Sequence, residues 1–142
     1  MDPIKGFVGE YSFLSNEYNC QIFIEKDQLT YSNVESALIA QKSDYPGTRR
    51  KFSRLNALKA RKKSSNIPEN YEWEKNKDKI MMDILRIKFK KDNELGKKLI
   101  QTYPAELINE VTYNDEYYGV RYGNGQNKLG KMLEEIRDEI RK

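Results

Sequence analysis

Apolar side chains recur at three- and four-residue steps along most of this chain, which is the spacing of a buried helix face. Met81, Ile84 and Lys88 follow this spacing inside a predicted helix from Tyr71 to Lys90. We expect further helices over residues 32–43, 48–55 and 56–64, between Asn93 and Pro104, and from Asn127 to Ile140, with Thr48, Asn93 and Asn127 as N-caps.

Alternating apolar positions predict a smaller β component. Tyr18 to Ile24 alternates in part, Lys26-Asp27 forms a turn, and Leu29 to Tyr31 is a short return strand. Residues 107–111 read as another strand, residues 1–19 as an irregular or extended segment, and residues 114–125 as a loop. The chain has no repeat and no linker. We therefore predict a single domain over residues 1–142, of the α+β class, dominated by helices and containing a small β-sheet.

The helix over residues 32–43 carries charged side chains at both ends. Ser32 followed by Glu35 matches the capping-box pattern, in which the glutamate holds the backbone N–H of the serine. Glu35 and Lys42 are seven residues apart, so they share a helix face and can line a pocket. The alternatives are that Glu35 only completes the capping box and that Lys42 is a solvated cation at the helix end.

Composition excludes whole classes of chemistry. The chain has no histidine and one cysteine, so no histidine-based triad and no cysteine-rich or imidazole-based zinc site can form. Acid–base chemistry must use Asp, Glu, Lys or Tyr. We expect no metal and no cofactor, and we interpret Cys20 as a small buried strand residue rather than a nucleophile.

The location of the protein follows from what its sequence lacks. No apolar run approaches the roughly 18 residues that span a membrane, and the first residues lack the layout of a signal peptide. Cys20 has no partner for an internal disulfide, which suits a reducing compartment. We expect a cytoplasmic protein without membrane contact.

The net charge is +4 and the pI is about 9.0. This balance favours anionic partners such as phosphate-bearing ligands or nucleic acid, although a lysine-rich solvated surface explains it equally well. Four cations gather in one short stretch, and they are the candidates for DNA or RNA contact: Lys59, Arg61, Lys62 and Lys63.

Three stretches are unusual for packing alone. They are the aromatic segment from Tyr11 to Asn16, the acidic and aromatic segment from Asp115 to Gly119, and the segment from Gly125 to Gly130 just before a helix. Together with the Glu35 helix that ends in Ala40 and Lys42, and with Trp73, Met81 and Lys88-Phe89, they resemble the NADAR family, also called the YbiA-like proteins. The resemblance runs from Phe7 to Arg137. It departs from the family pattern at Tyr118, where the family usually has tryptophan.

The resemblance implies an N-glycosidase, because known members hydrolyse the ribose C1–N bond of ADP-ribosylated guanine or of phosphoribosylamino intermediates of riboflavin biosynthesis. The reaction builds positive charge on the ribose, which a carboxylate stabilises. The family resemblance implies that Glu35, Asp115 and Lys42 are the catalytic residues. The expected substrate-binding residues are Tyr11, Phe13, Asn16, Trp73, Tyr118, Gly119 and Asn127. On sequence alone, Phe13 and Trp73 are also typical core residues.

Two other functions stay open at the level of the sequence. The change at Tyr118 is compatible with a module that binds ADP-ribose or a nucleotide without cleaving it. The cations from Lys59 to Lys63 are compatible with a nucleic-acid-binding protein, whose affinity falls steeply with salt.

Overall fold

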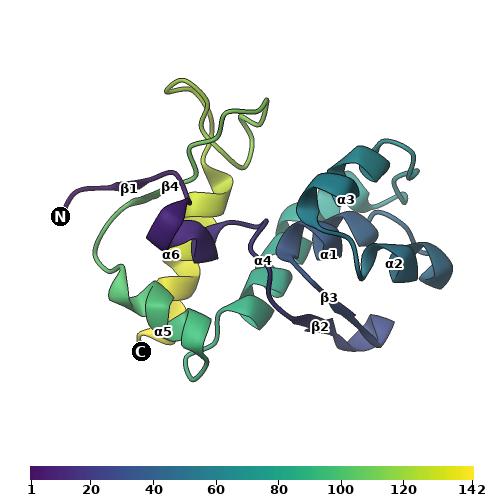
Figure 1. Ribbon diagram of the computed structural model, residues 1–142, viewed down its shortest axis with the longest axis horizontal. Coiled ribbons are helices and arrows are strands. Elements are labelled where there is room, and N and C mark those ends of the chain that lie inside the picture. The colour runs from purple at the N-terminus through teal and green to yellow at the C-terminus, as the bar shows by residue number, and fades with distance from the viewer. The chain divides into compact units, whose positions relative to one another are not determined.

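The computed structural model describes residues 1–142 and has the predicted α+β class, with six α-helices, two 3-10 helices and four short strands. The strands form two separate two-stranded sheets instead of one small sheet. The chain packs into two compact units (Figure 1). Unit 1 comprises residues 1–15 and 89–142, and unit 2 comprises residues 16–88.

Unit 2 begins with the predicted hairpin. Strand β2 (Ile22–Ile24) pairs antiparallel with β3 (Leu29–Tyr31), and the turn is the short helix η2 (Glu25–Asp27) followed by Gln28 in a left-handed conformation. Ile22 and Ile24 are buried and Phe23 is 49% exposed, as the alternation predicts. The strand begins later than predicted, although Cys20 still bonds through its backbone N–H to Ser32 O.

Helix α1 (Val34–Ala40) is the centre of unit 2. It contacts α2 (Pro46–Phe52), α3 (Ala57–Ser64) and α4 (Trp73–Lys88), and these helices lie with the hairpin in Figure 1. Every residue of α1 is buried except Glu35. A helix that is apolar around nearly its whole circumference needs such a surrounding layer, since no face of it can meet water.

Two predicted helix starts are wrong. Asn33, not Ser32, is the N-cap of α1, because the Asn33 side chain accepts the Ser36 N–H while Ser32 Oγ donates to Leu55 O. Helix α2 begins at Pro46 instead of after Thr48, since proline fits the first helical turn, where its missing N–H has no intrahelical partner.

Unit 1 joins the two ends of the chain. Strand β1 (Ile4–Lys5) pairs in parallel with β4 (Leu107–Ile108), and η1 (Gly9–Leu14) follows β1. Residues 1–19 therefore contain a strand and a 3-10 helix instead of only irregular structure. Both elements are too short to produce a periodic pattern in the sequence.

The two long elements of unit 1 are α5 (Glu94–Gln101) and α6 (Lys128–Ile140), which pack against each other. The buried Arg137 guanidinium of α6 donates to Thr102 Oγ1 at 3.0 Å and to Ala105 O at 2.8 Å, so it ties α6 to the end of α5. No helix of the protein combines the length and apolar character needed to cross a membrane.

Candidate functional site

The N-terminus of α1 is held by a cluster of polar side chains. Asn33 Oδ1 accepts the Ser36 N–H at 2.7 Å and satisfies the helix start. Three further donors converge on one carbonyl oxygen, Leu55 O: Ser36 Oγ at 2.6 Å, Asn33 Nδ2 at 2.9 Å and Ser32 Oγ at 3.0 Å. The end of α1 is thereby fixed to the segment between α2 and α3.

Glu35 lies in the first turn of this fixed helix. It is the second residue of α1, so it does not stand at the third position, from which a capping-box glutamate reaches back. Its backbone N–H donates to Asn16 O at 3.1 Å. The cap is made by Asn33, and Glu35 is the only partly exposed residue of the helix. The N-cap of α1 is therefore Asn33, and Ser32 does not occupy the position that the predicted capping box gives it.

Asn16, whose backbone carbonyl accepts the Glu35 N–H, has an unsatisfied polar atom in its side chain. The residue is 7% exposed, and its side-chain N–H group contacts Met81 Sδ at 3.6 Å. Its amide oxygen is buried and accepts no hydrogen bond. A buried acceptor without a partner is rare in native proteins and costs about 1–3 kcal/mol. Such an atom is suited to accept a hydrogen bond from a ligand hydroxyl or a water molecule.

A buried lysine lies on the same face of α4 as Met81. Lys88 is 2% exposed, and its ammonium group lies 5.6 Å from the centre of the Tyr18 ring. Burial lowers the pKa of Lys88 to about 8, and the neighbouring Cys20 only partly opposes this shift. Burial likewise raises the pKa of the Cys20 thiol, which the Lys88 charge opposes. Cys20 is half-buried, slightly more open than predicted.

Lys42 is engaged at a different helix end. Helix α1 ends at Ala40, so Lys42 lies beyond it, and the predicted shared helix face with Glu35 does not form. The Lys42 ammonium donates to Ser64 O and to Ser64 Oγ, both at 2.9 Å. A cation at the C-terminus of a helix is electrostatically favourable, so Lys42 stabilises the end of α3.

The aromatic residues expected to hold a substrate differ in exposure. Trp73 and Phe13 are buried, which agrees with the core alternative for both rings. Tyr11 and Phe13 also line a cavity of about 770 Å³ in unit 1, together with residues of β1 and α5. Lys98 of α5 lies 5.6 Å from the centre of the Phe13 ring.

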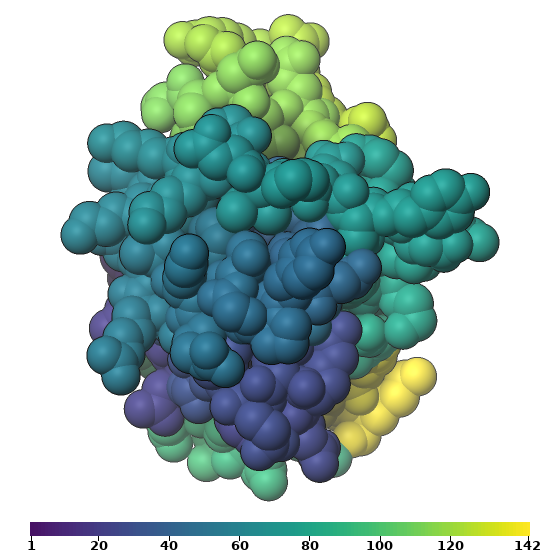
Figure 2. All heavy atoms as spheres, turned by 90° about the vertical axis from the view of Figure 1, so that its right-hand side faces the viewer, coloured from purple at the N-terminus to yellow at the C-terminus, as the bar shows by residue number.

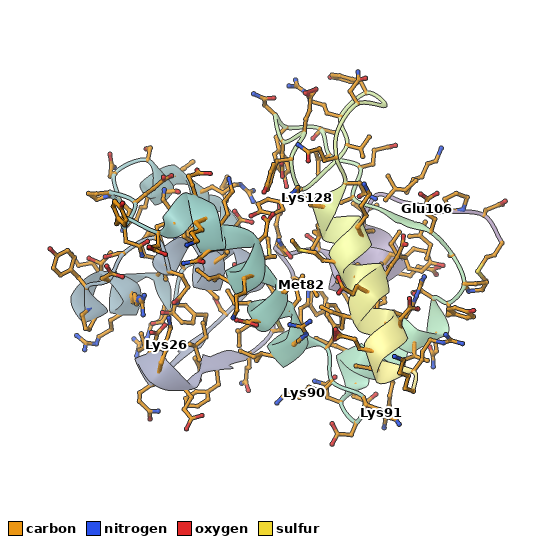
Figure 3. The ribbon with its side chains drawn as sticks, turned by 180° about the vertical axis from the view of Figure 1, so that it is seen from behind. Lys26, Met82, Lys90, Lys91, Glu106 and Lys128 are labelled. Atoms are coloured by element: carbon orange, nitrogen blue, oxygen red, sulfur yellow. The ribbon has the colours of Figure 1, made fainter.

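Asp115 organises a turn in unit 1. Its Oδ1 accepts the backbone N–H groups of Tyr118 at 3.0 Å and Tyr117 at 3.2 Å. The two tyrosine rings meet edge to face with centroids 4.7 Å apart, and the Lys128 ammonium lies 4.5 Å from the Tyr117 centroid. Lys128 is the first residue of α6 (Figure 3). A half-buried aromatic and cationic surface results at this helix start.

The glycines of the same region are required by packing. A Cβ atom on Gly130 would lie 2.0 Å from Leu107 O, and one on Gly125 would lie 2.2 Å from Gly119 O. One on Gly119 would lie 2.8 Å from Asn109 O. These positions therefore serve the close approach of backbone segments, whatever else they do.

Asn127 fastens β4 to the start of α6. It occupies the N-cap position, but its side chain does not cap the helix. Instead, Asn127 Oδ1 accepts the Asn109 N–H at 2.8 Å and its Nδ2 group donates to Leu107 O at 2.9 Å. The amide that the sequence offered for ribose or phosphate is thus already hydrogen-bonded within unit 1.

The predicted site residues fall into both units. Asn16, Glu35, Lys42 and Trp73 belong to unit 2, and the others (Tyr11, Phe13, Asp115, Tyr118, Gly119 and Asn127) belong to unit 1. The structure brings Asn16 to Glu35 and directs Lys42 to Ser64. A cleft shared by Glu35 and Asp115 stays a prediction.

Sequence reasoning missed Lys88 as a site residue. The signal was present, because Lys88 continues the apolar spacing of Met81 and Ile84, and a lysine inside an apolar stripe is predicted to be buried. No cluster of three or more Cys, Asp or Glu side chains is placed to hold a metal ion.

Comparison with known proteins gives concordant matches. The family model described as the NADAR domain matches residues 6–141. Proteins named N-glycosidase YbiA are similar to the chain: that of Escherichia coli (strain K12) is 40% identical over 74 residues, covering 51% of this chain and 46% of that protein. That of Shigella boydii serotype 4 (strain Sb227) is 34% identical over 123 residues, covering 82% and 75%. The chain thus spans about half the length of the E. coli relative in that match.

Two further matches extend over nearly the whole chain. A protein of Vibrio vulnificus (strain YJ016) named as a riboflavin biosynthesis protein is 28% identical over 134 residues, covering 92% of this chain and 36% of that protein. The NMR structure of the E. coli protein YbiA has a TM-score of 0.82 and 30% sequence identity, covering 99% of this chain and 84% of that chain.

Proposed function

The chain belongs to the NADAR family, and from this premise we propose that it is an N-glycosidase, a hydrolase that cleaves the bond between ribose C1 and a nitrogen atom. The observation that carries the proposal is the position of Glu35. All the other residues of α1 are buried, and Glu35 alone is partly exposed, with its carboxylate in the first turn of the helix.

The proposed chemistry uses groups present in unit 2. When the C1–N bond breaks, the base leaves with its bonding electrons and the ribose becomes electron-poor. The Glu35 carboxylate stabilises this positive charge and accepts a proton from the attacking water. The free acceptor of Asn16 holds a ribose hydroxyl or that water. The product sugar carries the new hydroxyl at C1, and the proton taken from water passes from the Glu35 carboxyl group to the leaving nitrogen, so the base is released with an N–H and Glu35 is again a carboxylate.

Lys88 is a second ionisable group of unit 2, buried on the helix that also carries Met81, the contact of the Asn16 side chain. An amine with a pKa of about 8 is neutral in about a tenth of molecules at pH 7. A neutral buried amine can act as a base or a nucleophile, which an exposed lysine at this pH cannot do effectively. Replacing Lys88 by arginine keeps the charge and removes the titration. We expect this variant to lose turnover and to lose the rise of activity towards pH 8.

The substrates we propose are ADP-ribosylated guanine, free or attached to nucleic acid, and phosphoribosylamino intermediates of riboflavin biosynthesis. The relatives' names, which include a riboflavin biosynthesis protein, support the second class. Tyr118 keeps an aromatic face for stacking on the base where the family pattern has tryptophan, so we expect a changed preference among bases more than a loss of activity.

Hydrolysis of both substrate classes by wild type and Glu35→Gln tests the proposal. The matched control is Glu94→Gln, because Glu94 is also a first-turn acid, in a helix capped by Asn93 through the Gly96 N–H at 2.7 Å. Each change removes one favourable charge–dipole interaction, worth about 0.3–1 kcal/mol. We expect only Glu35→Gln to lower kcat, by a factor of about 1000.

The alternative function has its own outcome in this experiment. If wild type binds ADP-ribose in calorimetry but releases no base after long incubation, the protein is a non-catalytic binding module. If both glutamate variants lose activity and stability in the same proportion, Glu35 has only a structural role.

A further inference from the structure

The positive charge of this protein is concentrated in one segment. Residues 45–68 contain eight Lys and Arg and no Asp or Glu, while the whole chain carries only +4. All other residues together therefore carry −4. A segregation of this kind produces a local positive field much stronger than the net charge indicates.

Six of the eight cations are exposed and unpaired. Arg49 and Arg61 have partners, because Arg49 pairs with the buried Asp27 at 2.6 Å and Arg61 pairs with Glu17 at 3.1 Å. The remaining six lie on α2, on α3 and on the segment between them: Arg50, Lys51, Arg54, Lys59, Lys62 and Lys63. We call these six residues the α2–α3 basic face.

The inward side of the same helices is apolar. Phe52 of α2 and Ala57 and Ala60 of α3 are buried, so the cations of both helices are left on the outer side. Figure 2 looks onto the side of unit 2 where α2 lies, and atoms of residues 45–65 cover much of this side. The six exposed cations belong to the segment that covers this side, and they are the groups available to contact phosphates there.

The basic face adjoins the candidate site in unit 2. Leu55, whose carbonyl oxygen anchors the N-terminus of α1, directly follows Arg54. Arg61 of α3 reaches Glu17, the neighbour of Asn16. A polymer that follows α3 is thus led to the helix start that carries Glu35.

We propose that the α2–α3 basic face binds the phosphate backbone of a single-stranded nucleic acid. Regularly spaced phosphates match several exposed cations, and Tyr45 beside α2, a residue that is 75% exposed, offers an aromatic ring on which an unpaired base can stack. An anionic membrane fits less well, because Tyr45 and Leu58 are the only large exposed apolar side chains of this segment.

Binding by this face stands without any catalysis. The further idea that the α2–α3 basic face presents a base of the bound strand to Glu35 rests on the N-glycosidase function proposed above. If that function holds, the preferred substrate is a modified base within a strand rather than a free nucleotide, since the backbone contacts add affinity that a free nucleotide cannot obtain.

The test is the affinity of the full chain for a fluorescently labelled 12-nucleotide single strand, measured by anisotropy at several salt concentrations. Each phosphate contact on a single strand contributes a slope of about −0.7 to log K against log salt. We expect the triple variant Arg50→Glu/Lys59→Glu/Lys62→Glu to bind at least tenfold more weakly, with the slope reduced by about 2.

The matched control carries the same change of charge in unit 1. Lys90, Lys91 and Lys131 are exposed, and Lys90 and Lys91 follow α4 (Figure 3). Their triple change to glutamate should weaken binding less than threefold. Equal losses in the two triple variants overturn the proposal, because the effect is then one of net charge. Equally tight binding to vesicles containing anionic lipid, or displacement of the strand by polyglutamate at equal charge, also overturns it.

A second arm separates this proposal from the N-glycosidase function. Glu35→Gln should bind the strand as wild type does, and the α2–α3 triple variant should cleave a free ribosyl substrate as wild type does, with an unchanged melting temperature. Suppose that Glu35→Gln loses turnover while the α2–α3 triple variant still binds the strand as wild type does. This result overturns only the proposed nucleic-acid surface. Specific strand binding by a wild-type protein that cleaves nothing overturns only the enzymatic function.

Discussion

Asn16 keeps an amide oxygen buried and unsatisfied, beside the first turn of α1. Such an atom costs about 1–3 kcal/mol, which a ligand can recover by donating a hydrogen bond to it. Leucine has nearly the same shape without the polar atoms. We therefore expect Asn16→Leu to unfold in urea at the same or a higher concentration than wild type, while kcat/KM falls at least tenfold. A variant that loses stability and keeps its activity would contradict a ligand-binding role.

Lys88 makes the stability of the protein depend on pH. Its pKa of about 8 in the folded state lies below the ordinary value of 10.5, so the unfolded chain binds more protons between these two values. The Lys88 contribution to stability therefore rises from pH 8 to pH 10.5, and below pH 8 the buried charge costs roughly 3 kcal/mol.

Replacing Lys88 by methionine tests whether the contribution of Lys88 to stability rises with pH, as argued above. We expect Lys88→Met to be more stable than wild type at pH 7, and we expect the difference in unfolding free energy to shrink as the pH rises from 8 to 10.5. Urea unfolding of both proteins at several pH values measures it. A difference that does not change with pH would show that Lys88 is not a buried titrating cation.

The elements of unit 1 are packed closely enough that single methyl groups matter. A Cβ atom on Gly130 of α6 would meet Leu107 O of β4 at 2.0 Å, while one on Gly47 of α2 meets nothing within 4 Å. We expect Gly130→Ala to lower the free energy of unfolding by about 2 kcal/mol or more, through displacement of the backbone. Gly47→Ala should instead raise it by about 0.5 kcal/mol, through helix propensity. Melting curves of the two variants test both signs.

A helix could be predicted from the sequence where its three- and four-residue apolar spacing continued over several turns. The helix predicted over residues 71–90 is α4, and Asn93 caps α5 as expected. The cap of α1 was not predictable, since Ser32 and Asn33 are both good capping residues, and the choice depends on Leu55 O, which is distant in sequence. The two-residue strand β1 was not predictable because its partner, β4, lies about 100 residues away.

The sequence suggests residues for the candidate site but does not fix their roles. Family resemblance pointed to Glu35 and Asn16, which the structure brings together. It also pointed to Asn127, Gly119 and Lys42, whose observed contacts are structural. A pattern of residues does not distinguish a side chain that binds substrate from one that fixes the backbone around it, because both requirements restrict the residue type.

At the scale of the whole molecule, the path of the chain makes the two units unequal. Unit 2 is one continuous segment, residues 16–88, whereas unit 1 needs residues 1–15 as well as 89–142. The pairing of β1 with β4 closes unit 1, and β1 precedes unit 2 in the sequence. Unit 2 is thus inserted into unit 1. The family model nevertheless matches residues 6–141, so both units belong to the family domain.

This insertion predicts how the chain tolerates division. The fragment 16–88 contains α1 with every element that surrounds it, so we expect it to fold alone, with dispersed amide signals in its NMR spectrum. The fragment 89–142 lacks β1 and η1 and should remain disordered, because Leu107 and Ile108 lose their strand partner. Joining residues 1–15 to its N-terminus through a flexible linker should restore its structure. A fragment 16–88 without dispersed signals would show that the core of unit 2 requires unit 1.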